Sequence, residues 1–292
     1  MGSMTMISIN TNYGGIFAAK ASSQSQLQID QAMERLSTGK RINHARDDAA
    51  GQAIATRLTA EIEGLAMASR NVADGQSLVD TAEGALVETH ALLLRMREIG
   101  VQAANGTLSS SDNEALDAEF QQLVAEIDRI SDNTSWAGTK LLNGDATGDY
   151  NTSATFTFQA GVNNAIADRI TIEVKNADSA TLGVKDLNAG ANVVNLLDMT
   201  NAQAAITKVD DAIASVSAER GKLGAVSNRM SSTMANLDQI TVNLTASKGR
   251  IEDSDFAAET GNLAKGQILQ QAATAMLAQA NASKQQVLTL IR

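Results

Sequence analysis

Apolar residues recur at alternating steps of three and four along both flanks of the chain, and this spacing predicts long amphipathic helices. One series begins after Asn71, and its helix is expected to end at Asn105-Gly106, because glycine is typical just past a helix end. The apolar positions of this series are Val72, Val79, Ala82, Leu86, Leu93, Met96 and Ala103.

A second helix is predicted to follow. Ser111-Asp112-Asn113-Glu114 has the pattern of a capping box, in which a hydroxyl and a carboxylate satisfy the free backbone donors at a helix start. The predicted helix then presents an apolar face that comprises Leu116, Phe120, Leu123, Ile127 and Ile130.

The longest predicted helix runs from residue 200 to residue 247, with Thr200-Asn201-Ala202-Gln203 as its expected cap. At 1.5 Å per residue this helix is roughly 70 Å long. A helix of that length favours a coiled-coil bundle over a compact globule.

The middle of the chain has a different period. Thr155-Phe156-Thr157-Phe158 and residues 169–174 alternate with period two, and Gly161-Val162-Asn163-Asn164 between them is turn-like, so a β-hairpin is predicted. Residues 176–199 carry mixed signals and are predicted to be loop. The predicted fold class is therefore mainly α: a long antiparallel coiled-coil or helical-bundle rod with a small β-hairpin region.

The two ends of the chain are poor in charge. Residues 1–29 contain Lys20 as their single charged residue, and residues 256–292 contain only four charges. A lone amphipathic helix cannot bury its own apolar stripe, so the ends need a partner surface, and another copy of the chain is the expected partner. The predicted assembly residues follow a 3.5-residue repeat and are Leu269, Ala273, Met276, Ala280, Val287 and Leu290.

Composition narrows the classes of function. Proline and cysteine are absent, so proline interrupts no helix, and disulfides and thiol chemistry are excluded. A net charge of −10 without a basic stripe argues against nucleic acid and against anionic membranes. No apolar run approaches the roughly 18 residues of a membrane span, so membrane insertion is not expected. The N-terminus lacks the pattern of a secretory signal, which predicts a cytoplasmic protein or one exported by another route.

The sequence offers little conventional chemistry. His44 and His90 are the only histidines, and neither has the spacing of a metal site, so no metal and no cofactor is predicted. The adjacent pair Asp47-Asp48 precedes a predicted helix from Ala49, where acidic groups interact favourably with the helix dipole. No catalytic residue is predicted, and the chain is not expected to be an enzyme.

Two sets of residues resemble bacterial flagellin. Leu36-Ser37-Thr38-Gly39-Lys40-Arg41-Ile42-Asn43, followed by Asp47-Asp48-Ala49-Ala50-Gly51, is similar to the N-terminal part of the family. Asn243-Leu244-Thr245-Ala246-Ser247 and Arg250-Ile251-Glu252-Asp253-Ser254-Asp255-Phe256 are similar to its C-terminal part. Such stretches cover residues 7–144 and 200–292, and they imply a short flagellin with few or no outer variable domains.

The resemblance implies a domain organisation and a set of partners. Terminal helices at 1–47 and 250–292 would form an inner-tube assembly domain, disordered in the free monomer. Residues 48–140 and 195–249 would form a helical rod, and 141–194 a short variable β insertion. The implied function is a structural subunit of the extracellular filament for swimming, exported through the flagellar type III channel. The implied partners are further copies, an export chaperone, and the cap and hook-junction proteins.

The resemblance also implies recognition by the host Toll-like receptor for flagellin. The positions concerned are Arg95, Ile99 and Glu119. Leu94 and Ile99 differ from the residues usual in the family, Gln and Leu. Arg95 and Glu119 serve equally well as packing or protofilament contacts, so both interpretations stay open.

Two alternatives have different consequences. A hook-filament junction protein shares the terminal helices, but the unbroken flagellin motifs argue against it. A cell-surface polysaccharide-binding homologue would need an aromatic platform, and Trp136, Tyr150, Phe156 and Phe158 are few for that purpose. A metalloprotease in the variable region would need a His-Glu-x-x-His motif, which this chain lacks.

Overall fold

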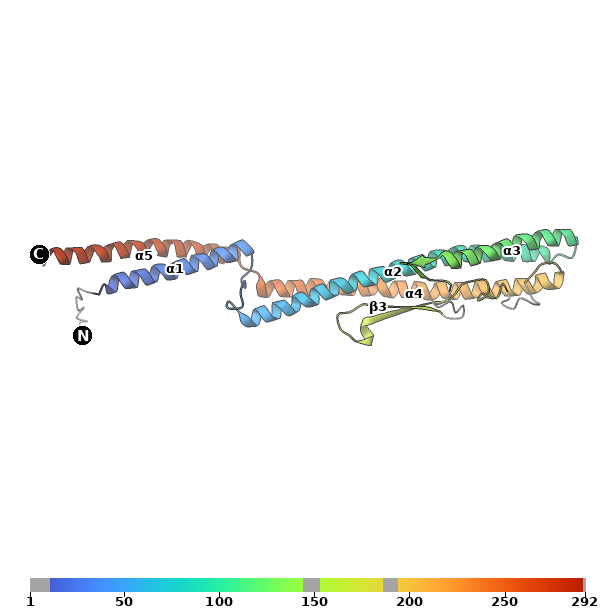
Figure 1. Cartoon of the computed structure of the whole chain (residues 1–292), viewed down its shortest axis with the longest axis horizontal. Coiled ribbons are helices and arrows are strands. Elements are labelled where there is room, and N and C mark those ends of the chain that lie inside the picture. Colours follow the sequence, from blue (N-terminus) through green and yellow to red (C-terminus); the bar gives the residue numbers. More distant parts are fainter. Residues whose placement is uncertain (1–10, 144–152, 186–193, 291–292) are drawn as a thin grey trace. The chain divides into compact units, whose positions relative to one another are not determined.

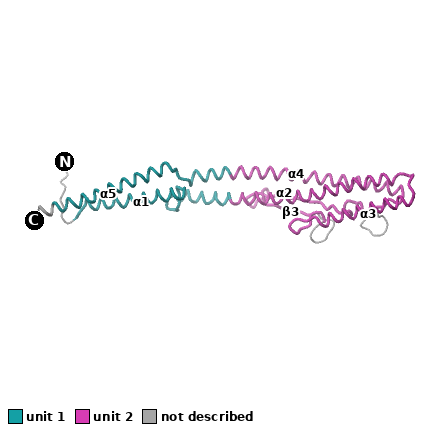
Figure 2. Tube along the Cα trace, turned by 90° about the horizontal axis from the view of Figure 1, so that it is seen from above, with its two compact units in different colours: residues 1–62, 242–292 teal, residues 63–241 magenta. Residues whose placement is uncertain are grey.

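The computed structural model describes residues 11–143, 153–185 and 194–290, with side chains as far as Gln286 (Figure 1). The described residues are mainly helical, as predicted, and they divide into two compact units. The terminal unit comprises residues 1–62 and 242–292, and the central unit comprises residues 63–241 (Figure 2). The three-domain division remains a prediction.

Two helices from opposite ends of the chain dominate the terminal unit. α1 (Tyr13–Thr38) is capped by Asn12, whose side-chain oxygen accepts a hydrogen bond from the Gly15 N–H at 2.9 Å. It ends at Gly39, which adopts a left-handed conformation with φ of 71°. α5 (Phe256–Leu290) lies beside α1 and runs in the opposite direction (Figure 1).

The connectors that leave this helix pair are tied to each other. Residues 39–48 lead from α1 to α2, and residues 253–255 lead from α4 to α5. Lys40 and Asp253 form an isolated antiparallel bridge between the two connectors. The backbone bonds across it run from the Arg41 N–H to the Glu252 carbonyl at 2.6 Å and from the Ser254 N–H to the Gly39 carbonyl at 3.0 Å.

α2 (Ala49–Ala103) begins and ends as the sequence predicts. Asp48 Oδ1 accepts a hydrogen bond from the Gly51 N–H at 2.8 Å, so this carboxylate caps the helix. The helix stops just before Asn105-Gly106. The apolar residues of the predicted series are all buried, which confirms that they form one core-facing stripe.

α3 (Ser110–Asn133) starts earlier than its predicted capping box, and the prediction of Ser111 as the cap is wrong. Ser109 is the N-cap, because its Oγ accepts from the Asp112 N–H while Asp112 Oδ2 accepts from the Ser109 N–H at 3.0 Å. The run of three serines at 109–111 offers a hydroxyl at each position. The nearest reciprocal carboxylate belongs to Asp112, and this selects the first serine.

The predicted β-hairpin is confirmed in the central unit. β3 (Ala154–Gln159) pairs antiparallel with β4 (Arg169–Val174), and a short 3-10 turn, η1 (Ile166–Asp168), lies between them. A second, unpredicted hairpin joins β1 (Ser135–Trp136) to β2 (Thr139–Lys140). Its two turn residues, Ala137 and Gly138, both have positive φ, as a tight two-residue turn requires.

α4 (Met199–Glu252) is the long helix near the C-terminal end, and its predicted cap is displaced. The Ala202 N–H donates to the Asp198 carbonyl at 2.9 Å, so the helical hydrogen bonds start before Thr200 and the expected cap lies inside the helix. Residues 194–198 before it and 176–185 are turns and loop, as predicted for these described parts of the segment.

The core of the central unit is aliphatic. α2, α3 and α4 contribute its largest buried side chains, which include Leu86, Leu93, Met96, Phe120, Ile127, Leu223 and Met230. The β3–β4 hairpin approaches α2 closely at Gly64, where an added β-carbon would lie 2.9 Å from Val162 Cγ1. No helix in the described part of the chain is long and apolar enough to cross a membrane.

Candidate functional site on the terminal helices

Small side chains form the seam between α1 and α5. Ala18, Ser25 and Ala32 are buried on α1, and Ala273 is buried on α5. Gly266 lies so close to Ile29 that an added β-carbon would meet Ile29 Cγ1 at 2.8 Å. Small residues on both helices therefore let the two backbones approach closely, Ile29 is buried opposite Gly266, and most of the other large apolar side chains are left on the outside.

Polar side chains tie the two helices together along their length. Arg35 Nη1 forms an ion pair with Glu259 Oε1 at 2.8 Å, and the side chains are 23% and 10% exposed. Gln270 Nε2 donates to Gln26 Oε1 at 2.7 Å. These contacts fix the register of the antiparallel pair.

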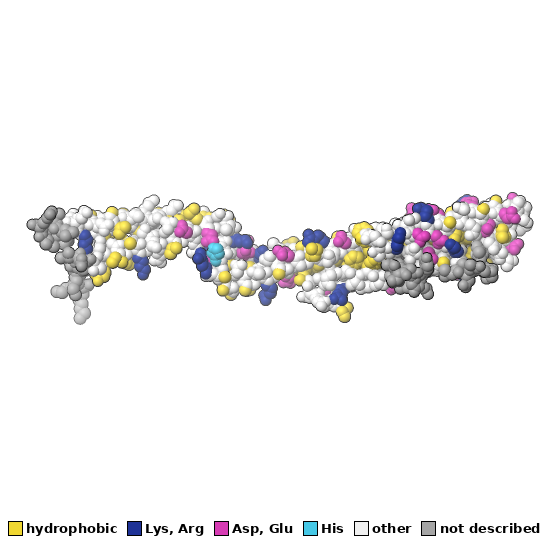
Figure 3. All heavy atoms as spheres, in the orientation of Figure 1, with side chains coloured by type: hydrophobic (Ala, Val, Ile, Leu, Met, Phe, Trp, Pro, Cys, Tyr) yellow, Lys and Arg dark blue, Asp and Glu magenta, His cyan; other side chains and the backbone are white. Residues whose placement is uncertain are grey.

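Large apolar side chains on the outside of this pair are exposed. Phe17 is 74% exposed and Met276 is 64% exposed. Charged side chains are sparse over the same helices and frequent elsewhere (Figure 3). We call this area the terminal apolar surface; it comprises Tyr13, Ile16, Phe17, Leu27, Met33, Ile268, Leu269 and Met276. Exposed apolar side chains gathered on two paired helices indicate a protein–protein contact.

A groove runs along one side of the pair. Its apolar part has a volume of about 490 Å³ and is lined by Phe17, Leu269 and Met276, among others. Its polar part has a volume of about 190 Å³ and is lined by Arg35, Glu259 and Lys265, among others. Gln28 lines both parts, so we treat them as one terminal groove.

The predicted assembly residues occupy two different environments. Leu269 and Met276 are exposed and line the groove, whereas Ala273 is 6% exposed and faces α1. Ala280 is half-buried, and its Cβ lies near Gly14. The side chains of Val287 and Leu290 lie outside the described residues. The role of all six in assembly remains a prediction.

The acidic pair at the start of α2 is structural in its contacts. Asp47 Oδ2 accepts hydrogen bonds from the backbone N–H groups of His44 at 3.0 Å and Asn43 at 3.2 Å. The hydrogen bond from the His44 backbone is the main cause that lowers the pKa of Asp47. His44 Nε2 lies 2.8 Å from Glu34 Oε1. These groups hold the connector that enters α2.

The residues proposed for receptor contact differ in their exposure to solvent. Arg95 Nη2 lies 2.8 Å from Glu119 Oε1, and Arg95 Nη1 lies 3.0 Å from Glu98 Oε2. The hydrogen bond with Glu119 is the first cause that raises the pKa of Arg95. This ion-pair cluster is exposed. Ile99 is only 1% exposed and belongs to the core of the central unit.

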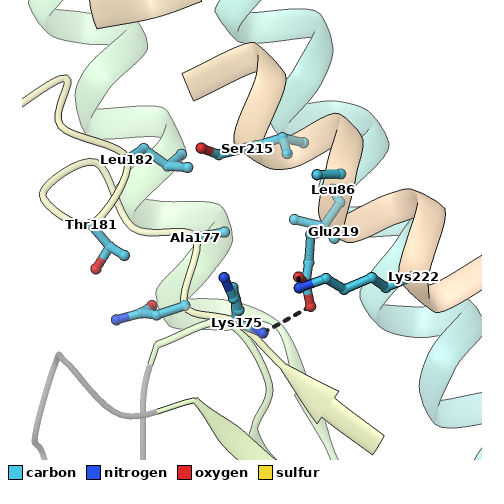
Figure 4. A pocket seen from close by; sticks show the side chains of 11 residues that line it. Leu86, Lys175, Ala177, Thr181, Leu182, Ser215, Glu219 and Lys222 are labelled. Carbon is cyan, nitrogen blue, oxygen red and sulfur yellow. Dashed lines mark hydrogen bonds and ion pairs between the residues drawn. The ribbon is translucent and has the colours of Figure 1, made fainter. Parts of the chain in front are cut away.

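A cavity of about 290 Å³ in the central unit contains a buried carboxylate that the sequence did not reveal (Figure 4). Glu219 is 5% exposed; it accepts a hydrogen bond from the Lys175 N–H at 3.2 Å and pairs with Lys222 Nζ at 3.4 Å. It thereby fastens the segment that follows β4 to α4. Its position on the flank of a helix of mixed polarity gave no signal in the sequence.

The described residues offer no cluster that could hold a metal ion. The fold and the exposed apolar side chains of the terminal helices together indicate a helical structural protein that contacts other protein chains.

Two family models match the two flanks of the chain. The bacterial flagellin N-terminal helical region matches residues 9–147, and the bacterial flagellin C-terminal helical region matches residues 206–291. A flagellin from Halalkalibacterium halodurans is 44% identical over 91% of this chain and 92% of its own length. A flagellin from Bacillus subtilis is 42% identical over 97% of this chain and 99% of its own length.

The chain therefore belongs to the bacterial flagellin family, and it is a structural subunit of the extracellular flagellar filament. A solved structure from Vibrio parahaemolyticus, described as a flagellar hook-associated protein, matches with a TM-score of 0.57 over 71% of this chain and 100% of that chain. At 16% identity this likeness shows a shared fold alone, and nothing in it favours the hook-junction alternative.

Proposed function

We propose that this subunit polymerises by burying the terminal apolar surface against other copies of the same chain, with residues 1–45 and 250–292 as the parts that drive assembly. The observation that carries the proposal is the exposure of Phe17, Leu27 and Met276 on helices that carry few charges. Burial of such side chains is favourable, and sparse charge removes the main desolvation cost of bringing the surfaces together.

The first experiment compares the full-length chain with a chain that lacks residues 250–292. Both are seeded and examined by electron microscopy and by sedimentation. Filaments are expected from the full-length chain, and a soluble helical monomer is expected from the truncated chain. Long filaments formed by the truncated chain would contradict the proposal.

Point variants give a sharper comparison. Phe17→Ser removes about 2 kcal/mol of apolar burial, which corresponds to a roughly thirtyfold rise in the critical concentration for assembly. Ile166→Ser is the matched control, because Ile166 is 88% exposed and lies in η1 of the central unit. Equal effects of the two variants would show that the terminal surface has no special role.

The proposal also includes an export chaperone and the cap and hook-junction proteins as partners of the terminal helices. An export chaperone would have to cover the terminal apolar surface before assembly, and the cap and hook-junction proteins would meet it at the ends of the filament. The chain acts as a building element and catalyses no reaction. The exposed apolar side chains of the terminal helices support this assignment.

For the host receptor, the exposed cluster of Arg95 and Glu119 supports a contact, whereas Ile99 is too buried to make one directly. Arg95→Ala is expected to weaken the response of a receptor-reporter assay to monomer. Ile99→Val, a core change, is the comparison variant and should leave the response unchanged. An unaltered response to Arg95→Ala would remove the receptor from the list of partners.

A further inference from the structure

α1 presents different chemistry on two sides. Successive residues of an α-helix are turned by about 100°, so Asp30 projects about 200° around α1 from Gln28, which lines the groove. Ile16 and Leu27 fall within about 60° of Asp30. Ile16 is 59% exposed and Leu27 is 67% exposed. We call the strip formed by Ile16, Leu27 and Asp30 the ridge.

The ridge and the groove have the same chemical order along the axis of the pair. The apolar part of the groove follows α1 from Gly14 to Gln28, and the polar part follows it from Gln28 to Arg35. On the ridge, Ile16 and Leu27 lie at the level of the apolar part, and the exposed Lys20 lies between them, about 20° around the helix from Leu27. Asp30 lies at the level of the polar part.

Lys265 stands in the groove at the level of Asp30. Its neighbour Gly266 packs against Ile29, so the two helices place Lys265 and Asp30 at one height of the antiparallel pair. Lys265 nevertheless lines the groove, whereas Asp30 lies on the ridge. Each copy therefore carries a cation on one side and an anion at the same height on the other side.

Most other charges on these helices are already paired within the chain. Arg35 pairs with Glu259, and Glu34 Oε1 lies 2.8 Å from His44 Nε2. Asp30 accepts a hydrogen bond from the Gln26 amide at 2.8 Å, and among the described side chains no cation pairs with it. Lys265 likewise has no described carboxylate as a partner. In addition, Arg35 Nε is buried in the described structure without an acceptor.

We propose that the ridge of one copy docks into the terminal groove of a second copy, with Asp30 of the first paired to Lys265 of the second. The inference rests on the proposed function and names the contact through which assembly proceeds. A contact between two different surfaces of identical subunits repeats without limit when its rotation does not close a ring, and it then builds a helical polymer. The groove also supplies hydrogen-bond donors near Arg35 for the incoming carboxylate.

The energetics favour this pairing over apolar contact alone. Burial of Ile16 or Leu27 in the apolar part of the groove would take Asp30 out of water, and an unpaired buried carboxylate is strongly unfavourable. Lys265 would be buried at the same moment. Mutual pairing offsets these costs in part, and it makes the register of docking specific, since a shift along the axis separates the charges.

The test is a charge exchange in the full-length chain. Asp30→Lys and Lys265→Asp are made singly and together, and the critical concentration for seeded assembly is measured by sedimentation, with electron microscopy of the pellets. Each single variant is expected to raise the critical concentration at least about tenfold, which corresponds to about 1.4 kcal/mol. The double variant is expected to return to within about threefold of the wild type. Circular dichroism verifies that every monomer remains helical.

The matched control separates specific pairing from net charge. Lys208→Asp combined with Asp30→Lys has the same net charge as the double exchange, but Lys208 is exposed on α4 in the central unit and belongs to neither the ridge nor the groove. It is expected to remain as defective as Asp30→Lys alone. Rescue by this control would overturn the inference, and so would single variants that assemble normally.

The outcomes also distinguish this inference from the proposed function. If Phe17→Ser abolishes assembly but the charge exchange gives no rescue, the terminal apolar surface drives assembly and the Asp30–Lys265 contact is wrong. If Phe17→Ser assembles like the wild type, the proposed function fails first.

Discussion

Arg35 supplies the cation of the largely buried ion pair between α1 and α5. Its partner Glu259 has a side chain that is only 10% exposed, and no other cation is paired with this carboxylate in the described structure. A charge in that position stays favourable only while its partner is present, because removal of one member leaves the other buried and unpaired. The ion pair therefore favours the one register of α1 and α5 in which Arg35 and Glu259 meet.

Arg35→Met is expected to destabilise the terminal unit by about 3 kcal/mol, since the Glu259 carboxylate loses its only cation. Thermal melting followed by circular dichroism measures the change. The double variant Arg35→Met with Glu259→Leu replaces both charges by apolar groups and should recover most of the loss. A double variant as unstable as the single one would show that packing, and not the unpaired charge, causes the effect.

Asp112 gives the start of α3 a dependence on pH. The hydrogen bond from the Ser109 hydroxyl is the main cause that lowers the pKa of Asp112 below its usual range. A lowered pKa in the folded state means that the stabilising contribution is present above the ordinary aspartate value and is lost as the pH falls through the folded value. The first turn of α3 is therefore expected to loosen only below about pH 4.

Amide hydrogen exchange at the first turn of α3 measures this loss, with pH 6 compared to pH 2.5 after correction for intrinsic rates. Asp112→Asn keeps an acceptor but does not titrate, so its protection should not change with pH. The same pH dependence in that variant would assign the effect to another group.

At the scale of elements, glycines on α2 divide into replaceable and required positions. Gly84 is exposed, and in the described structure nothing lies within 4 Å of an added β-carbon. Gly64 supports the β3–β4 hairpin, where the same atom would press on Val162. The helix gains conformational stability from alanine at either position, but only Gly64 has a packing cost that opposes the gain.

Gly84→Ala is expected to raise the stability of the central unit by about 0.5–1 kcal/mol. Gly64→Ala should give a smaller gain or a loss, because the turn near Val162 has to move away. Calorimetric melting of the two variants beside the wild type decides the matter. A larger gain at Gly64 would show that the hairpin yields without cost.

Sequence periodicity predicted the helices well because long stripes repeat one signal many times, as in the series from Val72 to Ala103. The β1–β2 hairpin escaped prediction because strands of two residues have no detectable period. The sequence also could not show which apolar residues of α5 are buried within the chain and which are exposed. One repeat contains Ala273, which packs against α1, and Met276, which is exposed, and a pattern on one helix does not tell an internal partner from an external one.

At the scale of the whole molecule, the terminal unit should depend on assembly more than the central unit does. The central unit buries large side chains such as Phe120 and Met230, whereas the seam of the terminal pair is built from small ones such as Ala18 and Ala32. Less apolar area buried within the chain means a lower free energy of local opening.

Proteinase K is therefore expected to trim monomers from both ends and to leave a fragment centred on residues 63–241, as seen by mass spectrometry. Assembled filaments should resist trimming, because docking covers the terminal helices. Equal cleavage of monomers and filaments would mean that these helices stay accessible after assembly.

The bridge between Lys40 and Asp253 has a mechanical consequence. The connectors that it joins are far apart in the sequence, yet backbone hydrogen bonds from Arg41 and Ser254 hold them side by side. A tensile load on α1 is therefore shared with α5, because the bonds across the bridge must shear before either connector can extend alone. In a filament that transmits rotation, α1 and α5 of each subunit then bear the load together, and neither helix is pulled out of place before the other.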